Sequence, residues 1–248
     1  MIDAHAHLDA CEPSPDELIA RSRAAGLEII LSVGMGIDSC RETVALAERH
    51  DDVFAVLGVH PHQASSADAG RLDELEQLLG SPRAVAIGET GLDYYRELAP
   101  RSAQRDLFSA ELELAAQLGK PVVIHSREAD ADTRVLLESF TGTVVLHCFS
   151  SPGLLDWALE RDCYVSFAGN VTYPNAEKLR DSARRVPSDR LLVESDCPYL
   201  APQPKRGRPN EPAFIAYTLA TLAAVRGEPT AELAQRTAVN TRTAFLLP

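Results

Sequence analysis

Short apolar runs alternate with longer segments of helical periodicity along the whole chain. Nearly continuous apolar runs are typical of strands that are buried on both faces, and therefore of a parallel sheet. Eight such runs, each followed by a helical segment, predict an α/β protein with the closed (β/α)8 architecture of a TIM barrel. The expected strands are the opening stretch 1–9 and residues 27–33, 53–59, 84–87, 121–124, 143–146, 163–167 and 190–195.

The helices between these runs have recognisable ends. Ser14 and Pro15 predict the cap and the first turn of the first helix, and Asp38 is expected to cap the second. A long loop is expected over residues 90–95. Further helices are expected at about 72–79, 101–118, 128–140, 152–161, 175–186, 211–226 and 230–246, and Phe54, Trp157 and Phe167 are expected in the core.

A doubly wound open sheet is the alternative architecture. No glycine-rich GxGxxG motif follows the first apolar run, which disfavours that alternative. The 248 residues match the length of one barrel, and no low-complexity linker divides them. We therefore expect a single TIM-barrel domain over residues 1–248.

The composition narrows the classes of function. No apolar run is long enough to cross a membrane, and no basic flank precedes an apolar run at the N-terminus, as in a secretory signal. The five cysteines have no CxxC spacing and predict reduced thiols in a cytoplasmic protein. The formal net charge is -12, whereas proteins that bind duplex DNA over a broad face are usually basic. Any binding of nucleic acid should therefore be local.

Six of the seven histidines lie at or just past the end of an expected strand. In a TIM barrel these ends meet at one mouth, where active sites form. Glu89 and Asp196 lie at the same level. His5 and His7 are separated by one residue and project from the same face of a strand, as two ligands of a divalent metal would. The six histidines are His5, His7, His60, His62, His125 and His147.

Four of these histidines and the two carboxylates predict a site for two divalent metal ions. Histidine-rich ligation suits zinc or manganese, and phosphoryl chemistry suits magnesium or manganese. The expected ligands are His5, His7 and Asp196 for one ion, His125 and His147 for the other, and Glu89 as the bridge.

A bridged pair of ions lowers the pKa of a shared water and stabilises both the attacking and the leaving oxygen. Asp196 is the best candidate to accept the proton of that water, so the expected catalytic residues are Asp196 and Glu89. Some barrel hydrolases bridge their metals with a carboxylated lysine. Here none of the three lysines, Lys120, Lys178 and Lys205, lies at the mouth end of a strand, so a carboxylate must bridge the ions.

These motifs resemble those of the TatD family of metal-dependent deoxyribonucleases, within the amidohydrolase-like barrels. The resemblance runs almost from end to end, and its two small departures touch no expected ligand: Ser195 replaces a threonine, and Pro209 lengthens an Arg-Asn-Glu-Pro approach. The matching segments are residues 3–8, 58–62, 86–95, 121–127, 147–150, 192–202 and 206–212.

The resemblance implies hydrolysis of DNA by a divalent-metal phosphodiesterase, a 3′–5′ exonuclease on single strands, with DNA repair as a process that uses it. We expect a monomer whose partner is single-stranded DNA or a frayed end. Arginines in the loop after the eighth strand suit phosphate oxygens, and Tyr94 and Tyr95, just past Glu89, suit stacking on a base. A solvated loop and packing at the barrel rim are the alternative interpretations. The expected substrate contacts are His60, His62, Tyr95, Arg127, Arg206 and Arg208.

Two other functions stay open at this point. A bridged hydroxide attacks a carbonyl carbon as well as phosphorus, so the same scaffold could cleave an ester such as that of an aminoacyl-tRNA. A metal-binding scaffold without catalysis is the third hypothesis, and the complete ligand set with its candidate base argues against it. The Lys205-Arg206-Gly207-Arg208 loop favours a phosphate substrate.

Overall fold

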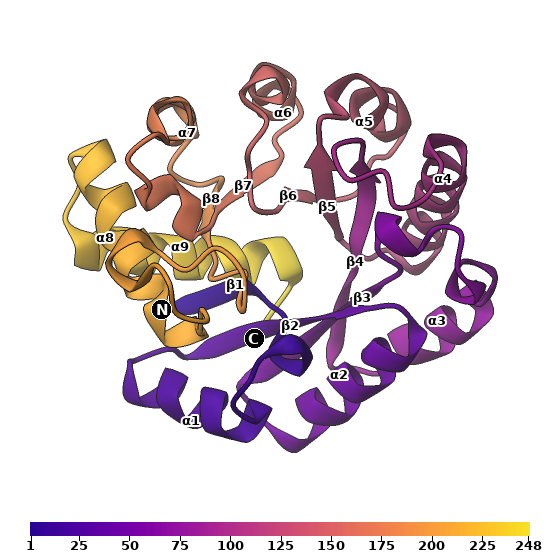
Figure 1. The fold of residues 1–248 in the computed structure, drawn as a ribbon, viewed down its shortest axis with the longest axis horizontal. Coiled ribbons are helices and arrows are strands. Elements are labelled where there is room, and N and C mark those ends of the chain that lie inside the picture. The colour runs from indigo at the N-terminus through magenta and orange to yellow at the C-terminus, as the bar shows by residue number, and fades with distance from the viewer.

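The computed structural model describes residues 1–248, and its eight strands form one parallel sheet in chain order. The sheet curves into a nearly closed barrel, with the helices around its outside (Figure 1). The predicted (β/α)8 architecture is therefore confirmed. The strands are β1 (Ile2–Ala6), β2 (Ile29–Met35), β3 (Val53–Gly58), β4 (Ala84–Asp93), β5 (Val122–Arg127), β6 (Val144–Leu146), β7 (Tyr164–Phe167) and β8 (Leu191–Val193).

A helix follows every strand, and an additional helix ends the chain. None of these helices combines the length and the apolar character that crossing a membrane requires. Ser14 forms the predicted cap with a reciprocal contact to Glu17. The helices are α1 (Pro15–Ala24), α2 (Ile37–Arg49), α3 (Leu72–Leu79), α4 (Arg101–Leu118), α5 (Asp130–Leu137), α6 (Leu155–Glu160), α7 (Glu177–Arg185), α8 (Ile215–Arg226) and α9 (Thr230–Phe245).

The predicted cap of α2 is wrong. The helix begins at Ile37, so Asp38 lies inside its first turn and Gly36 precedes it. The Ile37 N–H donates instead to Asp68 Oδ2 (3.1 Å), a side chain from a distant turn. Tertiary contact thus replaces the local cap, and sequence spacing alone could not show this.

β4 is longer than predicted and includes most of the expected loop 90–95. It continues to Asp93 because Gly91 pairs with His125 and Asp93 pairs with Arg127 on β5. Gly91 has a φ of 130°, and a Cβ at this position would lie 2.1 Å from the carbonyl oxygen of His125. The close approach of the two strands therefore requires glycine here. The register shifts between Ile87 and Thr90, which is where Glu89 enters the site.

The core has two layers, inside and outside the barrel. Ile29, Leu31 and Val33 alternate along β2 and belong to the inner cluster, whereas Ile30 packs outside against the helices. The inner cluster also contains Phe245 of α9. Phe54, Trp157 and Phe167 are buried, as predicted.

The first and last strands meet at the mouth of the barrel, which we define as the C-terminal ends of the strands. The Asp196 N–H donates to the His5 carbonyl (2.9 Å), and the His7 N–H donates to the Cys197 carbonyl (2.9 Å). Both hydrogen bonds lie just past β8 and at the end of β1. Closure of the barrel therefore brings the expected metal ligands at the end of β1 next to the one that follows β8.

Candidate metal centre

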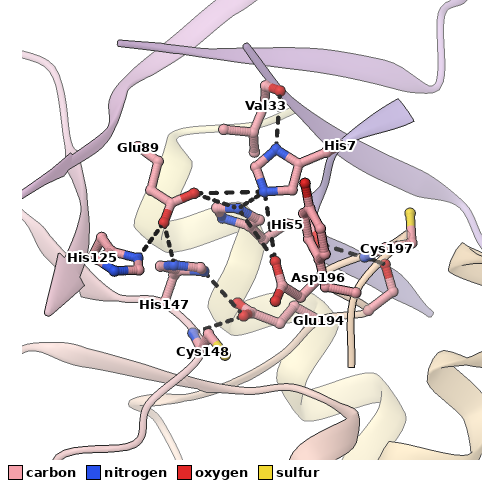
Figure 2. A network of polar contacts seen from close by, with 12 residues as sticks. His5, His7, Val33, Glu89, His125, His147, Cys148, Glu194, Asp196 and Cys197 are labelled. Carbon is pink, nitrogen blue, oxygen red and sulfur yellow. Dashed lines mark hydrogen bonds and ion pairs between the residues drawn. The ribbon is translucent and has the colours of Figure 1, made fainter. Parts of the chain in front are cut away.

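Glu89 is buried at the mouth, and its carboxylate faces the imidazoles of His5, His7, His125 and His147 (Figure 2). Its Oε1 is 2.6 Å from His125 Nδ1 and 2.8 Å from His147 Nε2. Its Oε2 is 3.4 Å from His5 Nε2 and 3.5 Å from His7 Nε2. The two oxygens of one carboxylate thus face two separate groups of imidazoles, which is the arrangement that a bridging ligand needs.

The first group consists of His5, His7 and Asp196. The Nε2 atoms of the two histidines are 3.1 Å apart, and Asp196 Oδ1 lies 3.6 Å from that of His7. Nδ1 of His7 is 3.4 Å from the carbonyl of Val33, a contact that places its proton on Nδ1. The lone pair of Nε2 then points into the site, as in histidines that bind metals.

The turn that carries Asp196 is fixed by buried hydrogen bonds. Asp196 has a φ of 56°, in the left-handed region that aspartate tolerates better than most residues. Asn210 is buried, and its Nδ2 donates to the carbonyls of Ser195 (2.7 Å) and Tyr199 (2.6 Å). Asp3 Oδ1 accepts from the Ser195 N–H (2.8 Å), which ties the turn to β1. These hydrogen bonds hold the backbone of Asp196 in one position at the mouth.

The second group consists of His125 and His147, and each has a carboxylate behind it. His125 Nε2 lies 3.1 Å from Asp93 Oδ2, and His147 Nδ1 lies 3.3 Å from Glu194 Oε1. Such carboxylate–histidine pairs orient the ring toward a metal and raise its basicity. Sequence reasoning gave no role to Asp93 or Glu194. The available signal was their position, because both are acidic residues next to a strand end that carries a ligand.

His60 and His62 lie beside the second group. The His62 N–H donates to His60 Nδ1 (3.1 Å), so a neutral His60 carries its proton on Nε2, which is 3.4 Å from Glu89 Oε1. His62 Nε2 lies 2.9 Å from Asp93 Oδ2. His60 is buried among the expected metal ligands, whereas His62 is partly exposed. The two expected substrate contacts therefore differ in environment.

Burial and mutual charge shift the pKa values of these groups. Burial lowers the pKa of His5 to about 3, helped by the charges of His147 and His7, and burial lowers that of His60 to about 4. Burial alone would raise the pKa of Glu89, but the histidines around it hold that pKa well below its usual value. Burial alone would also lower the pKa of His147, yet Glu89 and Glu194 hold it well above its usual value. Glu89 is thus an anion among imidazoles.

A further buried carboxyl, Glu111 of α4, holds two of the ligand-bearing segments. It accepts from the Val59 N–H (2.8 Å) and from the Thr90 hydroxyl (2.5 Å), the neighbours of His60 and Glu89. Burial raises its pKa to about 8. Sequence reasoning missed this residue because its helical position gives no sign that it reaches two strands.

The expected substrate contacts outside the ligand set lie at the rim of the mouth. The Arg127 guanidinium lies 3.9 Å above the ring of Tyr95, which is 57% exposed. The Arg206 guanidinium lies 4.5 Å from the ring of Tyr173 and donates to its hydroxyl (2.9 Å). The Arg208 side chain is exposed, and only its backbone N–H forms a hydrogen bond, to the Lys205 carbonyl (3.2 Å). Both arginine–tyrosine pairs present a flat, cationic surface to solvent.

The chemistry of the donor set fits divalent metal ions. Three clusters of three potential ligand atoms converge here, with the atoms of each cluster within 4.8 Å of one another. They are His5-His7-Asp196, which is the first group, His5-Glu89-His147, which spans both groups, and His60-Glu89-His125. Neither Glu89 nor Asp196 forms an ion pair with lysine or arginine, although both are buried. Their counter-charges within the chain come from histidines alone, and the neutral form of histidine is a metal ligand. Bound cations would complete the site.

Fold and site together define a metal-dependent hydrolase on a TIM barrel. The comparisons with known proteins agree. The family described as TatD related DNase matches residues 2–246. The metal-dependent hydrolase TatD of Mycobacterium tuberculosis is 38% identical over 261 residues, covering 99% of this chain and 97% of that protein. The chain belongs to the TatD family.

Two further relatives illustrate the match. The 3′-5′ ssDNA/RNA exonuclease TatD of Enterobacter lignolyticus is 38% identical over 239 residues, covering 93% of this chain and 92% of that protein. The crystal structure of the TatD homologue YJJV from Escherichia coli superposes with a TM-score of 0.93 at 31% identity, covering 100% of this chain and 98% of that one. The resemblance inferred from the sequence motifs is confirmed.

Proposed function

We propose that this protein removes nucleotides from the 3′ end of single-stranded DNA by hydrolysing phosphodiester bonds with two divalent ions. The observation that carries the proposal is Glu89, whose two oxygens face separate groups of imidazoles. The name of the exonuclease from Enterobacter lignolyticus supports the choice of substrate. Magnesium, manganese and zinc are the ions that suit the ligands and the reaction.

The chain would hold one ion on His5, His7 and Asp196 and the other on His125 and His147. Glu89 would contact both. When bound, the ions would activate water and stabilise negative charge on the phosphate. We assign His60 to a supporting role, because its Nδ1 is occupied by the His62 N–H and its Nε2 proton faces Glu89.

Asp196 is the proposed general base, accepting a proton from the attacking water. Its Oδ1 faces His7, and its side chain is 9% exposed, so it stands where the buried site meets the mouth. Glu89 is less suited, because both of its oxygens are already surrounded by imidazoles. A positioned carboxylate of this kind contributes about 10²–10⁴-fold to rate.

The rim would position the nucleotide chain. Arg206 and Arg208 suit phosphate oxygens, and the stacked pair of Arg127 and Tyr95 suits a base or the adjoining phosphate. His62 stands partly exposed beside Asp93 and suits a phosphate contact next to the second group. No broad basic face is needed, which agrees with the net charge of -12.

The test is a panel of substrates with magnesium, manganese or zinc. The protein should shorten a 5′-labelled single strand of DNA stepwise, and a strand with a blocked 3′ end should resist. Single-stranded RNA, duplex DNA and an aminoacyl ester complete the panel. Asp196→Asn protein, purified in parallel, controls for a contaminating nuclease. Cleavage of the aminoacyl ester without degradation of any strand would replace the proposal with the ester-hydrolase alternative.

A further inference from the structure

A row of aromatic and cationic side chains leads from the metal centre outward along the segment after β8. We call it the β8 rim. Its members come from the segment after β7, from the segment between β8 and α8, and from α8 itself. They are Tyr199, Tyr173, Arg206, Lys205, Phe214 and Tyr217.

The row begins at Tyr199, next to a metal ligand. The Tyr199 ring lies 5.8 Å from the ring of His7, and the side chain is 51% exposed. The backbone beneath it is held on both sides. Its N–H donates to the Asp196 carbonyl (2.9 Å), and its carbonyl accepts from Asn210 (2.6 Å). An aromatic surface is thus presented to solvent in a fixed position beside the site.

The row continues through Tyr173 and Arg206. The Tyr173 hydroxyl donates to the Ala201 carbonyl (3.1 Å) and accepts from Arg206 (2.9 Å). The guanidinium also lies 4.5 Å from the ring. These contacts hold the arginine on the ring, at the point where the segment leaves the mouth.

Lys205 links this pair to the start of α8. Its Nζ lies 4.8 Å from the centre of the Phe214 ring and 5.4 Å from that of Tyr217. The two rings are 6.3 Å apart in a T-shaped arrangement. Tyr217 is 38% exposed and lines a groove of about 550 Å³, together with Pro204 and residues of α8. The row therefore ends in a hollow outside the barrel.

The charge of the β8 rim is not neutralised within the chain. The acidic chain places Lys205, Arg206 and Arg208 within four consecutive positions, and none of the three forms an ion pair with a carboxylate. Arg41, Arg71 and Arg101, in contrast, each pair with acidic neighbours. Cationic side chains without ion-pair partners, interleaved with aromatic rings, are the combination that binds single-stranded nucleic acid without base preference. A polyanion with stacking bases matches this surface in both charge and shape.

We propose that the β8 rim binds the part of a single-stranded polynucleotide that lies 5′ of the nucleotide being removed. Tyr199 takes the base nearest the metal centre, Arg206 on Tyr173 takes the next phosphate, and Lys205 with Tyr217 receives the strand where it leaves the mouth. This inference rests on the proposed function, because it assumes that the 3′ end occupies the metal centre.

The experiment compares strands that do and do not reach Lys205. Manganese-loaded protein is assayed on 5′-labelled thymidine strands of about three and about twelve nucleotides. Lys205→Ala and Tyr217→Ala should each raise KM for the long strand about tenfold, several times more than for the short strand, with the loss in KM rather than kcat. Lys205→Ala should also make the slope of log KM against log salt shallower by about 0.7.

Two control variants separate the inference from general damage. Tyr217→Phe keeps the ring and should restore the KM of the wild type. Arg49→Ala removes an exposed arginine at the other end of the barrel and should leave both values of KM unchanged. If the wild type shortens both strands and Lys205→Ala and Tyr217→Ala have the same KM values as the wild type, the inference about the β8 rim is wrong and the proposed function stands. Wild-type protein that neither binds nor shortens a strand overturns the proposed function and the rim with it.

Discussion

The backbone N–H of Asp196 donates a hydrogen bond to the carbonyl of His5 (2.9 Å), although His5 lies on the first strand and Asp196 follows the last. This bond joins the segment after β8 to β1 at the level of the site. The two residues also face one another through their side chains, with His5 Nε2 4.0 Å from Asp196 Oδ1. The first group of proposed metal ligands is therefore complete only when the barrel is closed.

Replacing Asp196 with asparagine should abolish turnover while the fold is kept. Asparagine tolerates the positive φ of this position and retains one oxygen toward His7, but it cannot accept the proton of an attacking water. We expect kcat to fall by about 10²–10⁴-fold with an unchanged melting temperature. Elemental analysis of bound metal separates the role of Asp196 as a base from its role as a metal ligand, because only loss of the second lowers the metal content. Near-normal turnover would show that another group is the base.

Replacing Glu89 with alanine should cost bound metal. Both of its oxygens face imidazoles, so its removal takes one ligand from each group and the only carboxylate shared between them. Elemental analysis after dialysis should find fewer ions per chain than in the wild type. Glu113→Ala, an exposed glutamate on the outside of α4, is the matched control. An unchanged metal content in Glu89→Ala would refute the bridge.

The positions of the proposed ligands could be predicted because topology alone brings them together. Every strand of a TIM barrel ends at the same mouth, so His5, Glu89, His125 and His147 needed only correct strand ends to be brought together. The bounds of helices and strands could be predicted less well where a contact with a distant segment of the chain determines them. β4 extends to Asp93 through pairing with β5, and α2 is capped from a distant turn by Asp68.

The outer partners of the ligands could not be predicted in the same way. Asp93 and Glu194 each contact a histidine of a neighbouring strand, and Glu111 reaches two strands from α4. A place beside a strand end marks Asp93 and Glu194 as candidates, but the local sequence does not show which group any of the three contacts. His60 shows the same limit. Its strand end predicts that it is near the site, but only the contact of its Nδ1 with the His62 N–H shows which nitrogen carries the proton.

Replacing Asp93 with asparagine should weaken metal binding without removing a ligand. Asp93 Oδ2 lies 3.1 Å from His125 Nε2, and an amide there would donate to that nitrogen instead of accepting from it. The ring proton would then move to Nδ1, the atom that faces Glu89. Loss of such a partner costs about 10–100-fold in metal affinity. Titration against a fluorescent chelator measures the change, with Asp106→Asn on the exposed face of α4 as control. Equal affinities for Asp93→Asn and wild type would exclude this role.

Glu111 should make the protein less stable as the pH rises. Burial raises the pKa of Glu111 to about 8 in the folded protein, from an ordinary value of 4.5. Between these pH values the folded state binds the proton and the unfolded chain does not, so the free energy of unfolding falls as pH rises through this window. Below the window both states are protonated, and above it the buried charge exerts its full cost. The total effect is on the order of a few kcal/mol.

Glu111→Gln tests this directly, because the amide keeps an acceptor for the Val59 N–H and cannot titrate. Urea unfolding of the metal-loaded protein across the pH window should show a shallower fall in stability for the variant than for the wild type. Glu113→Gln, exposed on the same helix, should follow the wild type. Parallel pH dependences of Glu111→Gln and wild type would mean that the buried carboxyl titrates near its ordinary value, and that its contacts with Val59 and Thr90 compensate for burial.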